Sequence, residues 1–235
     1  MTSQTPSSMI LISFAALLFS SPIGAACTLA ATQAPLLELY TSEGCSSCPP
    51  ADAWLSQHMS DAASASSPIA LAFHVDYWDS LGWIDRYASA RNSERQRSVA
   101  STAGAGVYTP GFFLNGAEWR GFFSTRPLPA VKFAPMQINV SALLRERTLE
   151  ISSLTPGKLF VAISESSLTN QLKAGENRNR LLKHDHVVRL WQPLTAKTQM
   201  ILQTDLNLAN AKLVVWHEID GEASGAAQVD LLSCQ

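Results

Sequence analysis

The feature that most constrains the fold of this chain is a pair of cysteines, Cys45 and Cys48, placed where a predicted strand turns into a predicted helix. The apolar run of residues 35–40 leads into the pair and is typical of a strand, and residues 51–59 follow it with apolar side chains at helical spacing. The free N–H groups at a helix N-terminus favour an anion and therefore stabilise a nearby thiolate. We therefore predict a redox pair in which Cys45 attacks a disulfide and Cys48 resolves the intermediate. Because Cys45 precedes the helix and Cys48 starts it, we expect Cys45 to be the more exposed of the two.

The residues around the pair have opposing effects on the stability of a thiolate. Ser46 and Ser47 can donate hydrogen bonds to a thiolate, whereas the negative charge of Glu43 opposes one. Two prolines directly follow Cys48 and fit only the first turn of a helix, so we expect the helix to begin there. A structural disulfide and half of a zinc site are the alternatives, although the sequence has no second Cys-x-x-Cys and no histidine pair at zinc-finger spacing.

Length and composition indicate a folded protein. The 235-residue chain is 46% hydrophobic and only 15% charged, with a formal net charge of -2. These values favour a packed core and argue against intrinsic disorder. Because the sequence has no basic patch interleaved with aromatic residues, we expect no nucleic-acid partner, and nothing in it indicates a cofactor.

The N-terminus predicts export. Residues 9–19 form a short apolar run, and small residues follow it up to Ala26, which is the pattern of a secretory signal peptide over residues 1–26. Since no second long apolar stretch follows, we expect a periplasmic or secreted protein without a transmembrane segment. The same residues also fit a lipoprotein signal, in which Cys27 would carry a lipid anchor.

The 4 cysteines allow three disulfide pairings. With Cys45 and Cys48 paired locally, Cys27 and Cys234 are left at the two ends of the mature chain. Termini of a domain often lie close together, and an exported protein meets an oxidising environment, so these two positions favour a Cys27–Cys234 disulfide. The alternative is a lipidated or free Cys27 and a free Cys234.

A second buried strand is predicted at residues 68–76, where a nearly continuous apolar run suits a parallel sheet. With the helix between the two strands it makes a βαβ unit, and ligands bind beyond the carboxyl ends of such strands. We predict that the residues after these ends form the edge of a site beside the cysteines: Glu43, Asp76, Tyr77, Trp78 and Asp79. Alternatively, the aromatic residues among them only cap a core.

The next segment predicts a helix and then a hairpin. Residues 84–102 have a polar, helix-compatible pattern, which we interpret as a solvated helix face. Its arginines are Arg86, Arg91, Arg95 and Arg97. Thr109-Pro110 then opens a strand, where proline is tolerated, and Asn115-Gly116 is a strong signal for a hairpin turn.

The order of these elements resembles the thioredoxin fold. More closely, the chain resembles a secreted bacterial family known as domain of unknown function 1223, in the segments Thr41–Asp52, Phe73–Asp79, Val107–Pro110 and Glu176–Arg178. The resemblance covers nearly all of the mature chain. It implies a thioredoxin-like fold in which the Thr109-Pro110 bond is cis and packs against the cysteine pair, and it implies no assigned activity.

The chain also departs from ordinary thioredoxins. It lacks the tryptophan before the cysteines and the glycine between them, and a long helical insertion separates Asp76 from Thr109. These differences leave the substrate and the direction of electron flow open.

After residue 135 the pattern changes to short strand-like runs separated by polar turns, which suggests a β-sandwich. We therefore predict an α/β chain of two domains. Residues 27–134 would form a thioredoxin-like domain with a helical insertion, and residues 135–235 a β-rich, sandwich-like domain.

Two polar segments of the second half are candidates for chemistry. We interpret Glu176-Asn177-Arg178 as a plain turn, with a contact to the first domain or to a ligand as the alternative. His184 and His186 would share one face of a strand and, with His217, could bind a metal. A structural role is far more common for such histidines, and we predict no metal site.

The sequence thus predicts a thiol–disulfide oxidoreductase-like protein whose partners are protein or small-molecule thiols and disulfides. The Thr109-Pro110 loop would hold the substrate strand. The main alternative is a non-catalytic thioredoxin-like binding module with a structural Cys45–Cys48 disulfide. A third is a copper-handling protein that uses both cysteines and His74, because soft thiolates select Cu(I).

Overall fold

The structure, a computed structural model, describes residue 1 and residues 26–31, 34–59, 67–131 and 138–235. Within these ranges the helices are α1 (Pro49–His58) and α2 (Ala90–Thr102), and the short 3-10 helices are η1 (Asp76–Leu81), η2 (Gly121–Ser124), η3 (Leu208–Asn210) and η4 (Leu231–Cys234). The strands of the first half are β1 (Cys27–Ala31), β2 (Leu36–Thr41), β3 (Ile69–His74), β4 (Gly111–Leu114) and β5 (Ala117–Glu118). Those of the second half are β6 (Ile138–Arg145), β7 (Thr148–Ser153), β8 (Lys158–Glu165), β9 (Leu168–Gln171), β10 (Leu181–His184), β11 (Val187–Leu194), β12 (Lys197–Ile201), β13 (Ala211–Ile219) and β14 (Glu222–Asp230).

Nearly all of the predicted signal peptide, residues 2–25, lies outside the described residues. Among the helices of the described residues, none has the length and apolar character needed to span a bilayer.

Eight strands form one large mixed sheet in the order β14-β13-β8-β11-β3-β2-β4-β5. β2 and β3 run parallel, as the predicted βαβ unit requires, with Leu36 opposite Ile69 and Thr41 opposite His74. β4 runs antiparallel to β2, and β5 antiparallel to β4. Because β2 and β3 are parallel neighbours, their carboxyl ends meet at one edge of the sheet, and the Cys-x-x-Cys turn and η1 both start there.

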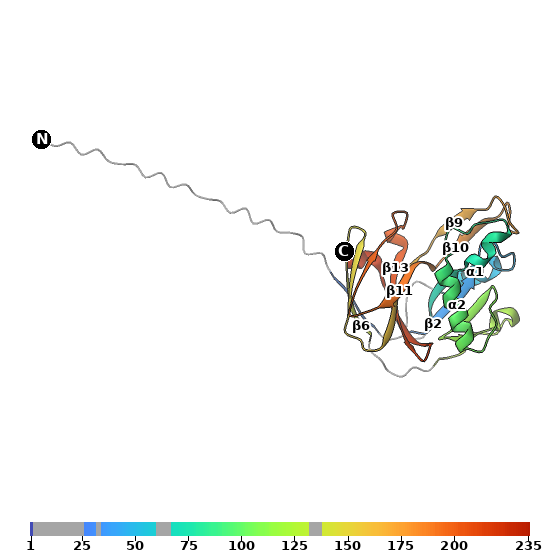
Figure 1. Cartoon of the computed structure of the whole chain (residues 1–235), viewed down its shortest axis with the longest axis horizontal. Coiled ribbons are helices and arrows are strands. Elements are labelled where there is room, and N and C mark those ends of the chain that lie inside the picture. The colour runs from blue at the N-terminus through green and yellow to red at the C-terminus, as the bar shows by residue number, and fades with distance from the viewer. Residues whose placement is uncertain (2–25, 32–33, 60–66, 132–137) are drawn as a thin grey trace.

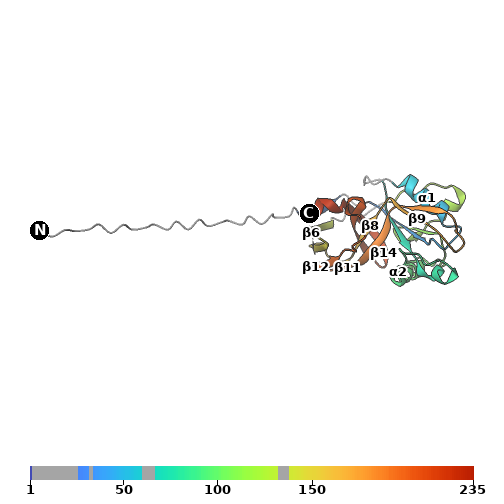
Figure 2. The same ribbon diagram turned by 90° about the horizontal axis from the view of Figure 1, so that it is seen from above.

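The two helices cover opposite faces of the sheet around β2, as Figure 2 shows. Leu55 of α1 packs with Leu39 on one face, whereas Val99 of α2 packs with Tyr40 on the other. Successive residues of a strand point to opposite faces, so neighbours in β2 enter different hydrophobic cores. This double coverage explains why every residue of β2 is buried.

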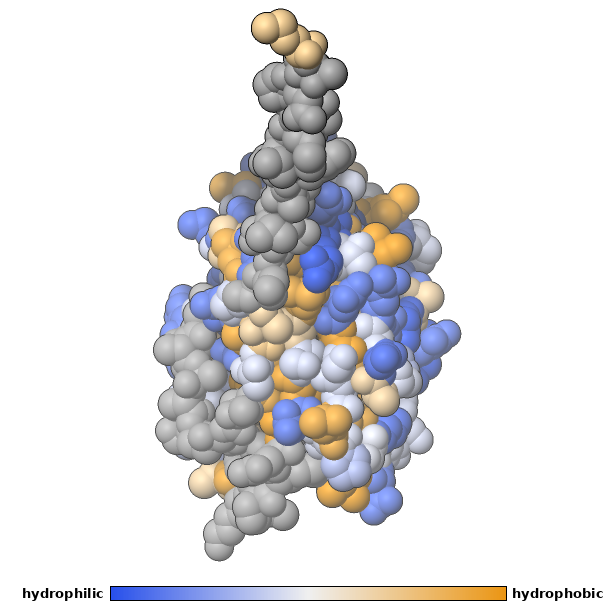
Figure 3. Space-filling model, turned by 90° about the vertical axis from the view of Figure 1, so that its left-hand side faces the viewer, coloured by the Kyte–Doolittle hydropathy of each residue, from blue (hydrophilic) through white to orange (hydrophobic). Residues whose placement is uncertain are grey.

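A second sheet of four strands has the order β1-β6-β7-β12. It packs on the β8 and β13 part of the large sheet, where Val140 and Ile151 share a core with Val161 and Val215. Figure 1 shows this two-layer region at one end of the molecule and the helices at the other. The outer face at the two-layer end carries both polar and apolar side chains (Figure 3).

The sheets are continuous across the predicted domain boundary at residues 134 and 135. β1, from the first half, pairs with β6 from the second, and β3 of the first half pairs with β11 of the second. Both halves of the chain therefore contribute to both sheets. The mixture of helices and strands confirms the α/β class, and one layer of the sandwich-like region belongs to the large sheet.

The hairpin predicted at Asn115-Gly116 is present and joins β4 to β5. Both residues have positive φ angles, 51° and 85°, as a type I′ turn requires. The helix predicted over residues 84–102 begins only at Ala90, where the Ser89 hydroxyl accepts a hydrogen bond from the Asn92 amide. The predicted strands of the second half are present, except that the run predicted at residues 184–191 is broken after His184, where β10 ends, and resumes as β11. β9 and β10 are strands that the patterns did not reveal.

Arg95 in α2 is buried, which corrects the prediction that the arginines of this segment share a solvated face. Its guanidinium donates to both carboxylate oxygens of Glu38 in β2, at 2.8 and 2.7 Å. It also donates to Glu218 in β13, at 3.0 Å. A buried charge needs such partners, so this pairing fixes α2 on the sheet. Arg86, Arg91 and Arg97 are exposed, as predicted.

Candidate functional site

The disulfide between Cys45 and Cys48 lies where the chain leaves β2 and enters α1. Cys48 is the N-cap residue of α1, and the two prolines that follow it occupy the first helical positions. The Cys48 amide donates to the Cys45 carbonyl at 3.2 Å, and the amide of Ala51 donates to the Cys48 carbonyl at 2.8 Å. The helix therefore begins where the prolines predicted, with Cys45 just before it.

Both cysteines are buried, each with 0% of its surface exposed. The prediction that Cys45 is more exposed than Cys48 is therefore wrong. The two residues between them, Ser46 and Ser47, are exposed instead, because the turn directs its serines outward and its sulfurs inward. A bulky substrate reaches either sulfur only if this turn moves.

Ser47 contacts one of the two sulfurs. Its hydroxyl oxygen lies 3.4 Å from Cys45 Sγ. In the reduced protein this hydroxyl can donate to a Cys45 thiolate, and a hydrogen bond to the charged form lowers the pKa of a thiol. This contact favours Cys45 as the nucleophile, whereas the exposure of the two cysteines does not distinguish them.

The Cys-x-x-Cys turn is held by the second half of the chain. The side-chain amide of Asn177, which is fully buried, donates to the main-chain carbonyls of Glu43 and Cys45, both at 2.9 Å. The amide of Ser46 donates to the Glu176 carboxylate at 3.1 Å. The preferred interpretation of Glu176-Asn177-Arg178 as a plain turn is therefore wrong, and the alternative of a contact with the first half is confirmed.

This contact exists because β9 and β10 form a small separate sheet that lies against α1. The loop between them carries Glu176 and Asn177, and it is closed by a hydrogen bond from the Leu172 amide to the Arg180 carbonyl at 3.0 Å. Arg180 also donates to the Asn177 side-chain oxygen at 2.7 Å, which orients the Asn177 amide toward the cysteine turn.

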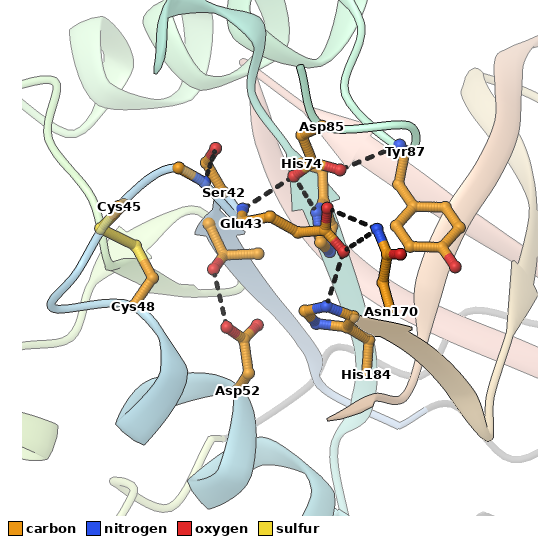
Figure 4. A network of polar contacts seen from close by, with 12 residues as sticks. Ser42, Glu43, Cys45, Cys48, Asp52, His74, Asp85, Tyr87, Asn170 and His184 are labelled. Carbon is orange, nitrogen blue, oxygen red and sulfur yellow. Dashed lines mark hydrogen bonds and ion pairs between the residues drawn. A yellow bond between two sulfur atoms is a disulfide. The ribbon is translucent and has the colours of Figure 1, made fainter. Parts of the chain in front are cut away.

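The Glu43 side chain is fully buried and points away from the disulfide into a polar cluster (Figure 4). Its carboxylate accepts hydrogen bonds from Trp83 at 2.7 Å, from Asn170 at 3.0 Å and from His184 Nε2 at 3.2 Å. These donors disperse its negative charge. Glu43 therefore destabilises a Cys45 thiolate less than the sequence predicts.

His74 ends β3 and forms a buried pair with Asp85, its Nδ1 atom lying 2.6 Å from Asp85 Oδ2. Burial alone would lower the pKa of His74, but the Asp85 carboxylate raises it to about 8. Burial would raise the pKa of Asp85, but His74 and the main-chain amides of Glu43 and Tyr87 hold it below its ordinary value. His74 Nδ1 therefore carries a proton that it donates to Asp85.

Asp52, from the first turn of α1, completes the cluster. Its Oδ2 atom accepts a hydrogen bond from Thr41 Oγ1 at 3.0 Å, and burial raises the pKa of this carboxyl. One potential ligand atom of each of Asp52, His74 and His184 lies within 4.8 Å of the others. α1, β3 and β10 bring these side chains together.

Trp78, from the predicted site edge, contacts both the cysteine turn and Thr109. Trp78 donates from its indole to Thr109 Oγ1 at 2.8 Å. Its Cβ also lies so close to Gly44 that a Cβ added there would be 3.1 Å away. The Thr109-Pro110 bond is cis, as predicted.

The remaining predicted edge residues lie on η1 and are half-buried. Tyr77 donates to the Gln96 side chain at 3.1 Å. Asp76 accepts from the Ser93 hydroxyl, and Asp79 accepts from the Asp85 amide at 3.1 Å. These contacts tie η1 to α2 and to the Asp85 loop.

The histidines of the second half do not form the metal site weighed from the sequence. β10 ends at His184, and His186 has a positive φ of 59°, so the two do not share a strand face. His186 Nε2 lies 3.3 Å from the Met59 carbonyl, and His217 pairs with Ser224 at 2.7 Å. His184 is grouped instead with Asp52 and His74, two residues that the sequence did not connect with it.

The second predicted disulfide is also present. Cys27, the first residue of β1, is joined to Cys234 in η4, with their Cα atoms 4.4 Å apart. This bond ties the start of β1 to η4 near the C-terminus. It uses the Cys27 sulfur that a lipid anchor would require, so the lipid alternative is not compatible with this structure.

Local patterns did not point to three members of the polar cluster, namely Asp52, Asp85 and Asn170. Each is an ordinary polar residue in its own segment. Only Asp52 gave a weak signal in the sequence. It follows Ala51 on the buried side of α1, where a carboxylate is unusual.

A family model described as "Protein of unknown function (DUF1223)" matches residues 36–219, and the chain belongs to this family. The X-ray crystal structure of protein AGR_C_4864 from Agrobacterium tumefaciens is similar, with a TM-score of 0.55 and 27% sequence identity over 85% of this chain and 96% of that chain. HBP35 of Porphyromonas gingivalis matches with a TM-score of 0.48 and 12% identity, over 85% of this chain and 75% of that chain. No curated protein matches the chain.

Proposed function

We propose that this protein is a periplasmic or secreted thiol–disulfide oxidoreductase that uses Cys45 and Cys48 as a reversible redox pair. The observation that carries the proposal is the position of the disulfide, with Cys48 capping α1 and Cys45 preceding it at the end of β2. The partial positive charge of a helix N-terminus favours the thiolate form of a cysteine. The Ser47 hydroxyl near Cys45 acts in the same direction.

The arrangement of the strands around the pair supports a thioredoxin-like fold for this part of the chain. The order β3-β2-β4-β5, with β2 and β3 parallel and β4 and β5 antiparallel, resembles the central sheet of thioredoxins. The cysteine pair also stands at the start of the helix between the parallel strands, as it does in that fold. The length of chain between β3 and β4, which contains α2, is the main departure.

The reaction exchanges one disulfide for another. The Cys45 thiolate attacks one sulfur of a substrate disulfide, and the other substrate sulfur leaves as a thiolate. The Cys48 thiolate then attacks Cys45 Sγ in the mixed disulfide, which forms the Cys45–Cys48 bond and releases the second substrate thiolate. The substrate gains two electrons and the cysteine pair loses two, and the reverse sequence oxidises a dithiol substrate.

An oxidising compartment is consistent with the two disulfides and with the predicted signal peptide. The partners are then protein or small-molecule thiols and disulfides. In this proposal the Thr109-Pro110 segment, whose Thr109 hydroxyl accepts a hydrogen bond from Trp78, contacts the substrate.

One observation favours the non-catalytic alternative, a binding module with a structural disulfide. The complete burial of both cysteines is typical of a structural bond. The copper-handling alternative has less support, since the two sulfurs are bonded to each other and His74 points to Asp85 and His184.

The reduction potential of the Cys45–Cys48 bond distinguishes these functions. The full chain is equilibrated in dithiothreitol or glutathione buffers and alkylated, and the peptide that contains both cysteines is quantified by mass spectrometry, separately from the Cys27 and Cys234 peptides. We expect a potential above about -300 mV, in the range of catalytic pairs. A lower potential would assign the bond a structural role and remove the basis of the oxidoreductase proposal.

A further inference from the structure

We propose that Asp52, His74 and His184 form a binding site for a divalent transition-metal ion, and that zinc is the ion that fits it. Each of the three residues is buried, and one donor atom from each lies within 4.8 Å of the others. The proposal concerns residues outside the disulfide and is independent of the redox function proposed above.

The two imidazoles each leave one ring nitrogen unused. His74 Nε2 and His184 Nδ1 are buried and have no hydrogen-bond partner among the described residues. An unpaired buried polar atom is costly, and such atoms in native proteins generally have a functional reason or an unseen partner. The two rings lie 5.0 Å apart at an angle of 80°, as they can around a shared ion.

The other nitrogen of each ring is bound to a carboxylate. His74 Nδ1 pairs with Asp85 at 2.6 Å, and His184 Nε2 pairs with Glu43 at 3.2 Å. Metal-binding histidines characteristically donate their second N–H to a carboxylate or carbonyl, which fixes the ring and makes the free nitrogen a better ligand. Both imidazoles have this arrangement, and Figure 4 shows the two pairs beside Asp52.

The third donor is a carboxylate that is already oriented. Thr41 Oγ1 binds Asp52 Oδ2 at 3.0 Å and leaves Oδ1 for an ion. Asp52, Glu43 and Asp85 bring three carboxylates into one buried region, and no lysine or arginine of the described residues forms an ion pair with any of them. A divalent cation would balance this negative charge and would take the place of the proton on His74 Nε2, since metal-binding imidazoles are neutral.

Two imidazoles and one carboxylate are a donor set that zinc takes in open sites, with a fourth position for water or a substrate atom. Zinc lies about 2.0–2.2 Å from such ligands, so donors around a tetrahedral ion are about 3.4 Å apart. One donor atom of each residue lies within 4.8 Å of the others, so the three side chains must move closer together to bind one ion. Hard cations such as magnesium prefer oxygen ligands and fit this set less well.

The site has a route to solvent. A surface pocket of about 350 Å³ is lined by residues of α1 and β10, including Asp52 and His184. An ion can therefore enter beside the two ligands without passing the disulfide.

The test uses the whole protein without a histidine tag. Both disulfides are formed, and bound metal is removed with a chelator. Oxidation removes the thiols as competing ligands. Zinc affinity and stoichiometry are measured by competition with a chromophoric chelator, and cobalt(II) provides a visible spectrum of the bound ion. We expect one zinc per chain, a rise in Tm on zinc addition, and a cobalt spectrum typical of four or five ligands.

Variants assign the ligands. H184A and H74A should each weaken zinc binding by at least about 100-fold, and D85N, which changes the carboxylate behind His74, by about 10- to 100-fold. H58A is the matched control, because His58 is an exposed histidine at the end of α1, and its affinity should equal that of the unmodified protein. If a histidine variant fails to fold, D52N, which keeps the side-chain shape, takes its place in the affinity measurement. The absence of stoichiometric zinc binding to the unmodified protein, or unchanged affinity in folded H184A or D52N, would overturn the proposal.

Discussion

Asn177 donates a hydrogen bond of 2.9 Å from its side-chain amide to the main-chain carbonyl of Cys45, although 132 residues separate the two in sequence. The same amide binds the carbonyl of Glu43. The conformation of the cysteine turn thus depends on a loop of the second half of the chain, and the first half alone lacks this support.

Replacing Asn177 with alanine should destabilise the protein and loosen the cysteine turn. In N177A the buried main-chain carbonyl of Glu43 loses its hydrogen-bond donor, which costs about 1–3 kcal/mol. We expect a drop of that size in the free energy of unfolding in urea and faster reduction of the Cys45–Cys48 bond by dithiothreitol. The exposed neighbour Arg178 is the control, and R178A should change stability by less than about 0.5 kcal/mol. Equal effects of the two variants would contradict the assigned role.

Ser47 should tune the reactivity of Cys45. Its hydroxyl lies 3.4 Å from Cys45 Sγ, and its removal in S47A withdraws a donor from the thiolate. We expect the pKa of Cys45 in the reduced protein to rise and its alkylation by iodoacetamide near neutral pH to slow several-fold. S46A is the comparison, since Ser46 contacts Glu176 rather than the sulfur. Identical alkylation profiles for Cys45 in S47A and the unmodified protein would remove this role.

The two cysteines of the pair should behave differently when replaced. C45S removes the proposed nucleophile and should abolish disulfide reductase activity. C48S keeps the nucleophile but cannot resolve the intermediate, so it should accumulate mixed disulfides with a substrate. Non-reducing electrophoresis and peptide mass spectrometry detect these adducts. If C45S is the variant that traps substrate, the roles of Cys45 and Cys48 are reversed.

Replacing Glu43 would not isolate the effect of its charge on the pKa of Cys45. The sequence alone suggests that removing its charge would lower the pKa of Cys45. In the structure the carboxylate binds Trp83, Asn170 and His184, so its replacement would disturb the cluster as a whole.

The Cys27–Cys234 bond should contribute strongly to stability. It closes a loop with a sequence separation of 207 residues, and bonds that close long loops restrict the unfolded chain most. We expect the double variant C27A/C234A to lose about 2–5 kcal/mol in urea unfolding while the Cys45–Cys48 bond stays oxidised. Mass spectrometry of non-reduced peptides should find Cys27 linked to Cys234. A diacylglyceryl group on Cys27 would disprove the pairing.

The buried pair of Arg95 and Glu218 should make stability depend on acid pH. Burial alone would raise the pKa of Glu218, but Arg95 and hydrogen bonds from Trp216 and Lys158 hold it below 4.5. A carboxyl whose pKa is lower in the folded state contributes stability above its ordinary pKa and loses it as the pH falls through the folded value. We therefore expect E218Q to be less stable than the unmodified protein at pH 7, with the difference shrinking below about pH 4.5 in urea unfolding. A difference that stays constant over this range would contradict the linkage.

The local elements follow from short-range features of the sequence. The apolar runs predicted β2 and β3, the prolines after Cys48 predicted the start of α1, and Asn115-Gly116 predicted the hairpin. These features depend on periodicity, on the missing N–H of proline and on the positive φ angles that the turn requires. The count of cysteines, with one pair close in sequence, was enough to suggest both disulfides.

Contacts between residues far apart in the sequence depend on the packing of the whole chain. His74 and His184 converge with Asp52 because β3, β10 and α1 lie side by side, and no repeat or spacing in the sequence records that. Arg95 belongs to a polar helix segment, and only the packing of α2 between Glu38 and Glu218 makes it buried. Side-chain patterns report the immediate surroundings of a segment, whereas partners are chosen by the packing of elements far apart in the chain. The chemistry of the buried cluster therefore becomes visible only once the chain has folded.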